Sequence, residues 1–419
     1  MDLFLVKRLK LKPRFSGGWL ALTGSKTLSI LALFLFFFSL PHIVQASPSQ
    51  QDIIENQIHE QVEEQLETLG IDEIKQFWDE IVTDYGGYLP ESQKGSLLEF
   101  IQGEKELSLK EWMLGLVKFV FHELIANGKL LSTLIMLMIF SMFLQTLQNS
   151  FEKSAVSKVA YAIVYMVLII IALNSFRVAI MYTEEAIETM INFILALVPL
   201  LLALVASSGG IASAAFFHPL ILFLMNTSGL LIQYIVLPLL FMSALLSIVS
   251  TLSEHYKVTQ LAQLLRNVSI GIIGVFLTIF LGVISVQGTT TAVADGITIR
   301  TAKFITGNFI PVIGRMFTDA TDTVISASVI LKNTVGIFGV VILLLIAAFP
   351  AIKVLSLAII YKLAAALLQP LGGGPVIACL DIISKSVVYI FAALAIVSLM
   401  FFLSITVIIA AGNLTLMVR

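Results

Sequence analysis

The chain has 419 residues, of which 58% are hydrophobic and 12% are charged, and its formal net charge is −2. This composition excludes an ordinary soluble domain and indicates a polytopic membrane protein. The single cysteine, Cys379, excludes an intrachain disulfide framework and a zinc ribbon, and we interpret it as a small buried hydrophobic residue. No block of charge beyond the extreme N-terminus is basic enough to bind nucleic acid.

Residues 1–46 have the order of a secretory signal. Six of them are Lys or Arg and one is acidic, the run 28–44 is apolar, and Ala46 follows as a small residue at the expected cleavage site. An uncleaved signal-anchor helix is the alternative. Both readings place the following residues on the outer face of the membrane, because Lys and Arg stay cytoplasmic.

Residues 47–111 form the acidic part of the chain, with 16 Asp or Glu and four Lys. Apolar side chains at three- and four-residue steps predict amphipathic helices over 51–69 and 72–83, and Gly86-Gly87 should end the second helix. We expect a small helical extracytoplasmic region that rests on the membrane or on a partner. Its acids lack the ligand spacing of a metal site, so we expect no metal and no cofactor.

Residues 112–127 are predicted to form an interfacial amphipathic helix, with Trp112 as an anchor at the headgroup level. His122 and Glu123 belong to this helix. Headgroup contact is the simplest reading of both residues, and catalysis is a minor alternative.

Long apolar runs fill residues 128–412, and they predict an all-α, polytopic membrane domain. A crossing takes roughly 20 apolar residues. The clearest runs are 130–147, 159–176, 191–206, 229–252, 270–286 and 387–411. Two further helices, 336–349 and 352–368, should be split at Pro350, so we expect about seven to nine membrane-embedded helices. Residues 413–419 would form a cytoplasmic tail.

Charges between the runs predict the direction of the first helices. Lys153 and Lys158 suggest a cytoplasmic loop, whereas Glu184, Glu185 and Glu188 fit the outer side. The helix over 128–149 should therefore run inward, the helix over 159–176 outward, and the helix over 191–206 inward again.

Small and polar residues interrupt the segment 207–252. We predict a short or re-entrant helix over 211–226, then a full span over 229–252, which makes His218 and Asn226 candidates for a transport pathway. A tight hairpin between two ordinary spans explains the same residues at least as well. A structural role for His218 is likewise the more common one.

Residues 288–333 are the least apolar stretch of the membrane domain, and Pro311 and Gly314 divide it. We predict two amphipathic or re-entrant helices over 292–308 and 312–331. Charges at membrane depth are functional by default, whereas surface ion pairs contribute little. The pathway candidates added by this reasoning, with one from the helix 352–368, are Asp295, Arg300, Lys303, Arg315, Asp319, Asp322 and Lys362.

Motifs of known catalysts are absent from the sequence. There is no phosphate-binding loop, no His-Glu-x-x-His and no Gly-x-Ser-x-Gly. We therefore expect no enzymatic activity and name no catalytic residue. Energy for transport would come from an ion gradient or from a separate partner.

Several short runs together resemble one family. They are Gly86-Gly87-Tyr88-Leu89-Pro90, Asp295-Gly296-Ile297, Arg300-Thr301, Phe309-Ile310-Pro311-Val312-Ile313-Gly314, Asp319-Ala320-Thr321-Asp322-Thr323, Leu331-Lys332-Asn333 and Gln369-Pro370-Leu371-Gly372. Over roughly residues 70–412 the chain resembles stage III sporulation protein AE, a polytopic membrane protein family of endospore-forming bacteria.

The resemblance implies a membrane component of the secretion-like channel complex between mother cell and forespore, required after engulfment for late forespore gene expression. It implies residence in the mother-cell membrane surrounding the forespore. It also implies partners: the other proteins of the stage III sporulation A operon, including a secretion-type ATPase and ring-forming proteins, and the forespore protein IIQ. The family supplies no catalytic residues to carry over.

Three hypotheses follow from the residues and the resemblance. The first is the channel component, with a homo-oligomer as one possible form. The second is a secondary transporter that moves a small solute toward the forespore, favoured by the interrupted segments 207–229 and 369–375. The third is a structural scaffold without a conduit.

Overall fold

The computed structural model describes residues 71–90, 108–150, 155–252, 257–309, 313–371 and 374–417, and for 287–323 its description is limited to the backbone. All of these residues belong to one compact unit, Asn56–Arg419. The expected signal and the expected helix over 51–69 lie outside the described residues.

Helices account for the secondary structure of the described ranges, which contain no strand. This confirms the predicted all-α class. The elements are α3 Asp72–Tyr85, α5 Leu109–Ala126, α6 Gly128–Ser150, α7 Ala155–Ser207, α8 Ile211–Leu231, the π-helical turn η2 Ile232–Val236, α9 Leu237–Leu252, α10 Thr259–Phe309, α11 Ile313–Leu368, the 3-10 turn η3 Gln369–Leu371 and α12 Pro375–Met417.

The described residues hold five helices that are long and apolar enough to cross a membrane, or six if the pair α5 and α6, bent by 44°, is one broken span. The five are Val159–Ser207, Ile211–Thr251, Thr259–Val286, Val324–Leu368 and Pro375–Ala410. Several pairs of helices that the sequence predicted as separate each form one helix within the described residues.

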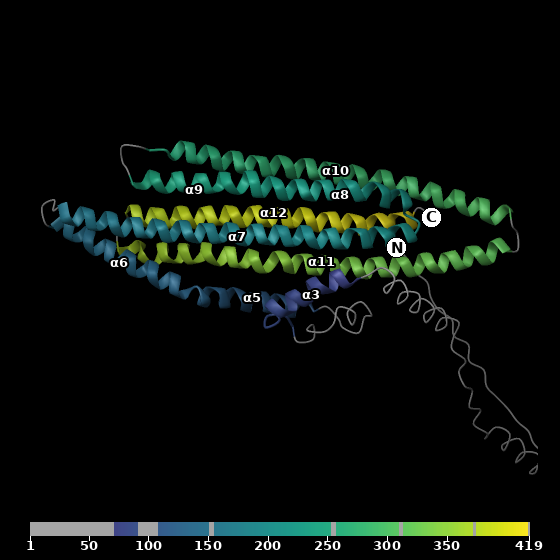
Figure 1. The fold of residues 1–419 in the computed structure, drawn as a ribbon, viewed down its shortest axis with the longest axis horizontal. Helices are drawn as coiled ribbons and strands as arrows, with labels where there is room; N and C mark the ends of the chain where they lie inside the picture. The colour runs from purple at the N-terminus through teal and green to yellow at the C-terminus, as the bar shows by residue number, and fades with distance from the viewer. Residues whose placement is uncertain are drawn as a thin grey trace, which may run out of the picture. The chain divides into compact units, whose positions relative to one another are not determined.

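The main helices are much longer than a bilayer is thick. α7, α10, α11 and α12 contain 53, 51, 56 and 43 residues. At 1.5 Å per residue they extend over roughly 65–84 Å, whereas the hydrocarbon core is about 30 Å thick. Figure 1 shows these helices lying along one another.

The predicted break between 176 and 191 is wrong. Glu184, Glu185 and Glu188 lie in the middle of α7 and not in a loop, so 159–176 and 191–206 run in the same direction. Charge was the reason for expecting a loop, but glutamate is a good helix former, and an exposed or partly buried carboxylate does not end a helix.

The predicted break at 226–229 is also wrong, because α8 continues through these residues. Gly229 is small for a packing reason: a Cβ atom built on it would lie 2.5 Å from Cδ1 of Ile191 in α7. Small residues let two helix backbones approach closely. The irregularity follows three residues later, in the π-helical turn η2.

The predicted split at Pro350 is wrong as well, since α11 contains Pro350 and runs on to Leu368. Proline is tolerated inside membrane helices where neighbouring groups replace the lost hydrogen bond. The expected helices over 292–308 and 312–331 are likewise the end of α10 and the start of α11.

Three predicted breaks are confirmed. α3 ends before Gly86, α7 ends at Ser207 before Gly209 with φ of 96°, and η3 separates α11 from α12. At Gly209 the left-handed backbone conformation favours glycine, because a Cβ atom would be strained there.

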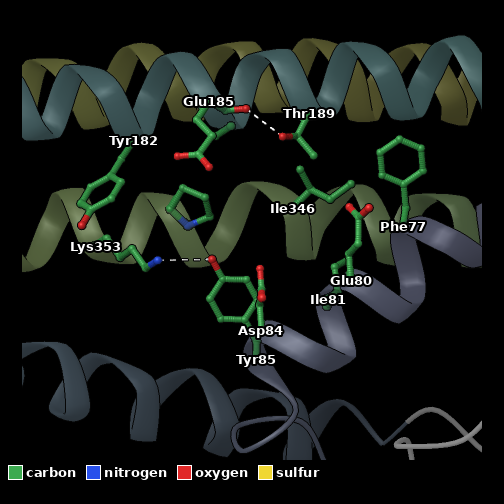
Figure 2. A pocket seen from close by; sticks show the side chains of 12 residues that line it. Phe77, Glu80, Ile81, Asp84, Tyr85, Tyr182, Glu185, Thr189, Ile346 and Lys353 are labelled. Carbon is green, nitrogen blue, oxygen red and sulfur yellow. Dashed lines mark hydrogen bonds between the residues drawn. The ribbon is translucent and has the colours of Figure 1, made fainter.

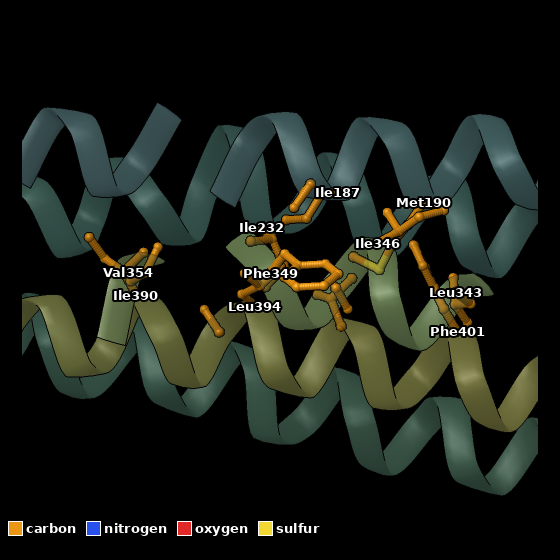
Figure 3. Close-up of a cluster of buried hydrophobic side chains, with 14 of the residues drawn as sticks. Ile187, Met190, Ile232, Leu343, Ile346, Phe349, Val354, Ile390, Leu394 and Phe401 are labelled. Atoms are coloured by element: carbon orange, nitrogen blue, oxygen red, sulfur yellow. The ribbon is translucent and has the colours of Figure 1, made fainter. Parts of the chain in front are cut away.

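The core lies where α7, α11 and α12 pack together, and α8, α9 and α10 pack against α12 and one another. Phe349 of α11 belongs to the cluster of buried apolar side chains, which also contains Ile232, Ile390 and Leu394 from neighbouring helices (Figure 3). Hydroxyl groups add bonds between helices: Tyr361 Oη donates to Ser175 Oγ at 2.7 Å, and Ser384 Oγ donates to the Ala358 carbonyl at 2.9 Å. Polar bonds of this kind help to fix helix pairs in an apolar surrounding.

Candidate functional site

Helix α3 packs against α7 and α11, and this contact creates the candidate site. The predicted apolar face of α3 is correct, since Ile74, Trp78 and Ile81 are buried. Phe77 meets Phe193 of α7 edge to face, with ring centroids 5.4 Å apart. The acidic side chains of α3 stay exposed, so burial of the apolar face is what holds the helix in place.

The C-terminal end of α3 inserts an aromatic ring into the bundle. Tyr85 stacks on Phe349 of α11 with ring centroids 3.9 Å apart and planes 4° from parallel. Phe119 of α5 presents its edge to both rings, at 5.7 and 5.0 Å. These three rings come from three different helices, so they join α3, α5 and α11.

The chain after α3 passes close to α5. A Cβ atom added to Gly115 of α5 would overlap the carbonyl group of Tyr88. Because a backbone carbonyl cannot move aside as a flexible side chain can, glycine is needed for this approach.

Lys353 of α11 holds the same end of α3 through its charge. Its Nζ donates a hydrogen bond to the Tyr85 oxygen at 3.4 Å, and it lies 5.3 Å from the Tyr85 ring centroid and 5.2 Å from that of Tyr182 (Figure 2). Both distances are within the range of cation–π attraction. Burial raises the pKa of the Tyr85 phenol and the Lys353 charge partly opposes this, so the phenol remains neutral at physiological pH.

A cavity of about 260 Å³ lies beside this contact. Its lining combines aromatic rings with charge. The residues are Phe77, Glu80, Ile81, Asp84, Tyr85, Tyr182, Glu185, Ala186, Thr189, Ile346, Pro350 and Lys353. Glu80, Asp84 and Glu185 are exposed carboxylates, whereas Lys353 is half-buried. We call this cavity and its lining the Lys353 site.

In the Lys353 site, the ammonium group of Lys353 lies next to two phenol rings, those of Tyr85 and Tyr182. Among the described residues, no group of three His, Cys, Asp or Glu side chains is arranged to hold a metal ion. We therefore interpret the site as the place where α3 packs on the membrane helices α7 and α11.

The α7 side of the site is tied to the π-helical turn. Gln233 of η2 donates from Nε2 to the Glu184 carbonyl at 3.3 Å, and Thr189 Oγ1 donates to the Glu185 carbonyl at 2.9 Å. The turn thus lies at the level of the three glutamates. π-Helical turns often occur at functional positions in membrane helices.

The predicted pathway residues do not gather in this site. Lys362 lies on α11 and its Nζ is 2.5 Å from Oδ1 of Asp381 in α12, while Lys385 Nζ is 2.6 Å from Oδ2 of the same carboxylate. Asn226 is exposed on α8. His218 lies in α8 before Pro219, and its side chain is outside the described part of the structure.

The remaining candidates lie on two helices. Asp295, Arg300 and Lys303 belong to α10, and Arg315, Asp319 and Asp322 belong to α11. Their side chains also lie outside the described part, so their role stays a prediction.

Five residues make contacts that sequence reasoning did not identify. Tyr85 and Lys353 build the site although 268 positions separate them, a distance that no local pattern reveals. Asp381 and Lys385 have the i, i+4 spacing of a helical ion pair, which was a usable signal. Lys332 is fully buried and donates to the Ile409 carbonyl of α12 at 3.0 Å.

Comparison with known proteins supports the resemblance seen in the sequence. The family described as "Stage III sporulation protein AE (spore_III_AE)" matches residues 92–412. The chain is 69% identical over 395 residues to the stage III sporulation protein AE of Bacillus subtilis (strain 168), covering 93% of this chain and 98% of that protein. No solved structure matches the chain.

Proposed function

Because the chain belongs to the stage III sporulation protein AE family and so acts in sporulation, we propose that it is a membrane component of the secretion-like channel complex between mother cell and forespore. The complex would be needed after engulfment for late forespore gene expression. The observation that carries this proposal is the family match, which extends over nearly all of the membrane domain.

The chain is a multi-pass membrane protein, with five apolar helices long enough to cross a bilayer among its described residues. We place it in the mother-cell membrane that surrounds the forespore. The expected secretory signal and the acidic segment that follows it support an outer location for α3. The packing of α3 on α7 and α11 would then bring the stretches around Glu185 and Lys353 to that side of the membrane.

The partners in this proposal are the other proteins of the stage III sporulation A operon, namely the secretion-type ATPase and the ring-forming proteins, together with the forespore protein IIQ. The absence of a phosphate-binding loop from the sequence supports a need for a separate energy source. An outward α3 would lie where ring proteins assemble between the two membranes.

One of the interruptions that favoured the transporter alternative is absent from α8. The alternative depended on helices interrupted at membrane depth, and α8 is continuous through 226–229. Two breaks of the predicted kind remain among the described residues, the one between α7 and α8 at Gly209 and the turn between α11 and α12. Uptake into liposomes that contain this protein alone would revive the transporter reading.

The proposal is tested in a sporulating strain that lacks the gene and carries a fluorescent reporter of late forespore transcription. We expect engulfment to finish and the reporter to stay off, with the complete gene restoring it. Normal sporulation of the deletion strain would overturn the proposal.

A second strain separates a conduit from a scaffold. It carries Asp295→Asn, Arg300→Gln, Asp319→Asn and Asp322→Asn together. Asp381→Asn alone is the control, because it removes a partly buried charge outside 288–333. We expect the quadruple variant to accumulate normally and leave the reporter off. Full rescue by this variant would favour the scaffold.

A further inference from the structure

The cavity of the Lys353 site contains charges of both signs that are not paired with one another. Glu80 and Asp84 of α3 and Glu185 of α7 line it together with Lys353 of α11. Within the described part of the chain, Lys353 forms no ion pair, and its ammonium donates to the oxygen of Tyr85 instead. A charge that is partly removed from water is normally compensated by an opposite charge. The cavity therefore keeps apart groups that a ligand could join.

These groups also have unused hydrogen-bonding capacity. An ammonium group has three N–H donors, and a carboxylate accepts up to about four hydrogen bonds. Lys353 uses one donor, on Tyr85. Glu80 accepts one bond, from Gln76 at 3.3 Å, and the Glu185 carboxylate has no hydrogen-bond partner among the described residues. The cavity thus offers free donors at the lysine and free acceptors at the carboxylates.

The donors and most of the acceptors lie at different ends of the cavity. Figure 2 shows Lys353 and Tyr182 at one end and Glu80 with Phe77 at the other, and the Glu185 carboxylate points from α7 toward α11. An elongated ligand with an acceptor at one end and a cationic group at the other would match this order. The aromatic ring of Phe77 adds a face on which a cation can lie.

Volume and charge narrow the class of ligand. The cavity of about 260 Å³ lies at the lower limit of the roughly 300–1,000 Å³ that pockets for drug-sized molecules occupy, so it suits a molecule about as large as one amino acid. Its lining has three carboxylates against one ammonium group. The ligand should therefore carry more positive than negative charge, because an excess of carboxylates attracts cations.

We propose that this cavity binds one basic amino acid. Its carboxylate or carbonyl group would accept hydrogen bonds from Lys353, and its guanidinium or ammonium group would lie among Glu80, Asp84 and Glu185. Free arginine or lysine offers this chemistry, and so does an arginine or lysine residue in a segment of another protein. A ligand held in this way bridges α3 to α7 and α11. The inference goes beyond the proposed channel role and does not depend on it, because binding is measured on the purified chain.

The test is a calorimetric titration of the full chain in lipid nanodiscs with L-arginine. We expect saturable binding. L-Glutamate should bind at least about tenfold more weakly, because its second carboxylate meets the three carboxylates of the lining. Agmatine, which is arginine without its carboxylate, should also bind about tenfold more weakly, since it leaves the donors of Lys353 unused.

Substitutions assign the two ends of the ligand to the two ends of the cavity. Glu185→Gln should weaken arginine and agmatine by the same factor of about ten, because both present a guanidinium group. Glu188→Gln is the matched control, since it removes an exposed carboxylate of α7 that does not line the cavity. Lys353→Met should remove the preference for arginine over agmatine. This ratio is measured within one variant, so it does not depend on how firmly that variant holds α3.

A blocked Gly-Arg-Gly peptide separates the two sources of the ligand. Tighter binding of the peptide than of free arginine would assign the cavity to a residue of a partner protein, and the reverse would assign it to a free amino acid.

Three results would overturn the inference. The first is that neither arginine nor the peptide binds to the parent protein. The second is that glutamate binds as tightly as arginine, or that Glu185→Gln binds arginine like the control Glu188→Gln. The third is that Lys353→Met keeps the parent's preference for arginine over agmatine.

Discussion

Lys353 of α11 and Tyr85 of α3 are joined by a hydrogen bond of 3.4 Å, and the same ammonium lies over the Tyr182 ring of α7. Lys353 of the membrane domain therefore binds a residue of α3 that precedes it by 268 positions, in addition to the buried apolar face of that helix. The neighbouring stack of Tyr85 on Phe349 supplies the apolar part of the same contact.

The first prediction separates these two parts. Tyr85→Phe keeps the stack and loses the hydrogen bond, so it should weaken the seating of α3 by about 0.5–1.5 kcal/mol. Tyr85→Ala also loses the aromatic contact and should cost about 2 kcal/mol or more. Protease cleavage near Gly86-Gly87 in membrane vesicles measures the effect, with Asp79→Asn on the exposed face as the control. Equal cleavage of the Phe and Ala variants would contradict the assignment.

A second prediction concerns the close approach of α8 to α7. Gly229→Ala should destabilise the bundle by about 1–3 kcal/mol, because the new methyl group meets Cδ1 of Ile191. Ile191→Val removes that carbon atom and should restore most of the loss. Gly271→Ala in α10 is the matched control, since nothing lies within 4 Å of its Cβ position. The midpoint of thermal unfolding in detergent is measured for the parent protein, for Gly229→Ala with and without Ile191→Val, and for Gly271→Ala. An unchanged midpoint for Gly229→Ala would argue against the close contact.

The buried Lys332 gives a third prediction. Lys332→Met keeps the volume in an apolar surrounding, so the protein should accumulate at its normal level. Lys332→Glu places an acceptor opposite the Ile409 carbonyl and should reduce accumulation several-fold, because a buried charge without compensation is costly. Immunoblots of membrane fractions measure how much of each variant accumulates. Similar amounts of both variants would show that the site is less enclosed than its burial indicates.

The ion pairs of Asp381 give a fourth prediction, in which we expect only a small effect. Asp381→Asn breaks the contacts with Lys362 and Lys385, but both lysines are largely exposed. The loss should therefore stay below about 1 kcal/mol, and forespore reporter activity should remain normal. A strong sporulation defect at normal protein level would instead mark this cluster as functional.

Much of the fold was predictable from the sequence, because apolar runs in a chain this poor in charge leave only the helix as a stable solution in lipid. The helix α3 was also predictable, since Ile74, Trp78 and Ile81 repeat at helical steps. The continuity of α7 and α8 through the predicted breaks was not predictable. Glu184 to Glu188 and Gly229 resemble breaks when the sequence is read alone, yet Glu185 lines the Lys353 site and Gly229 permits a close helix contact.

The Lys353 site was beyond sequence reasoning for a different reason. Its members come from α3, α7 and α11, and each has a common explanation when read alone: an interfacial tyrosine, a loop glutamate, a snorkelling lysine. Only the packing of α3 brings them to one place. The pathway residues chosen from 288–333 depend instead on side chains outside the described part, so they remain predictions.

The unbroken length of α7 and α11 has a mechanical consequence. A helix is a stiff rod, so a tilt imposed at one end must appear at the other. For a rod of roughly 80 Å that pivots near its middle, a tilt of about 10° displaces each end by about 7 Å in opposite directions. The Lys353 site lies near the middle of α7 and in the second half of α11, where α3 packs against both helices. A force that tilts the bundle at one face of the membrane would therefore displace the ends of α7 and α11 at the other face.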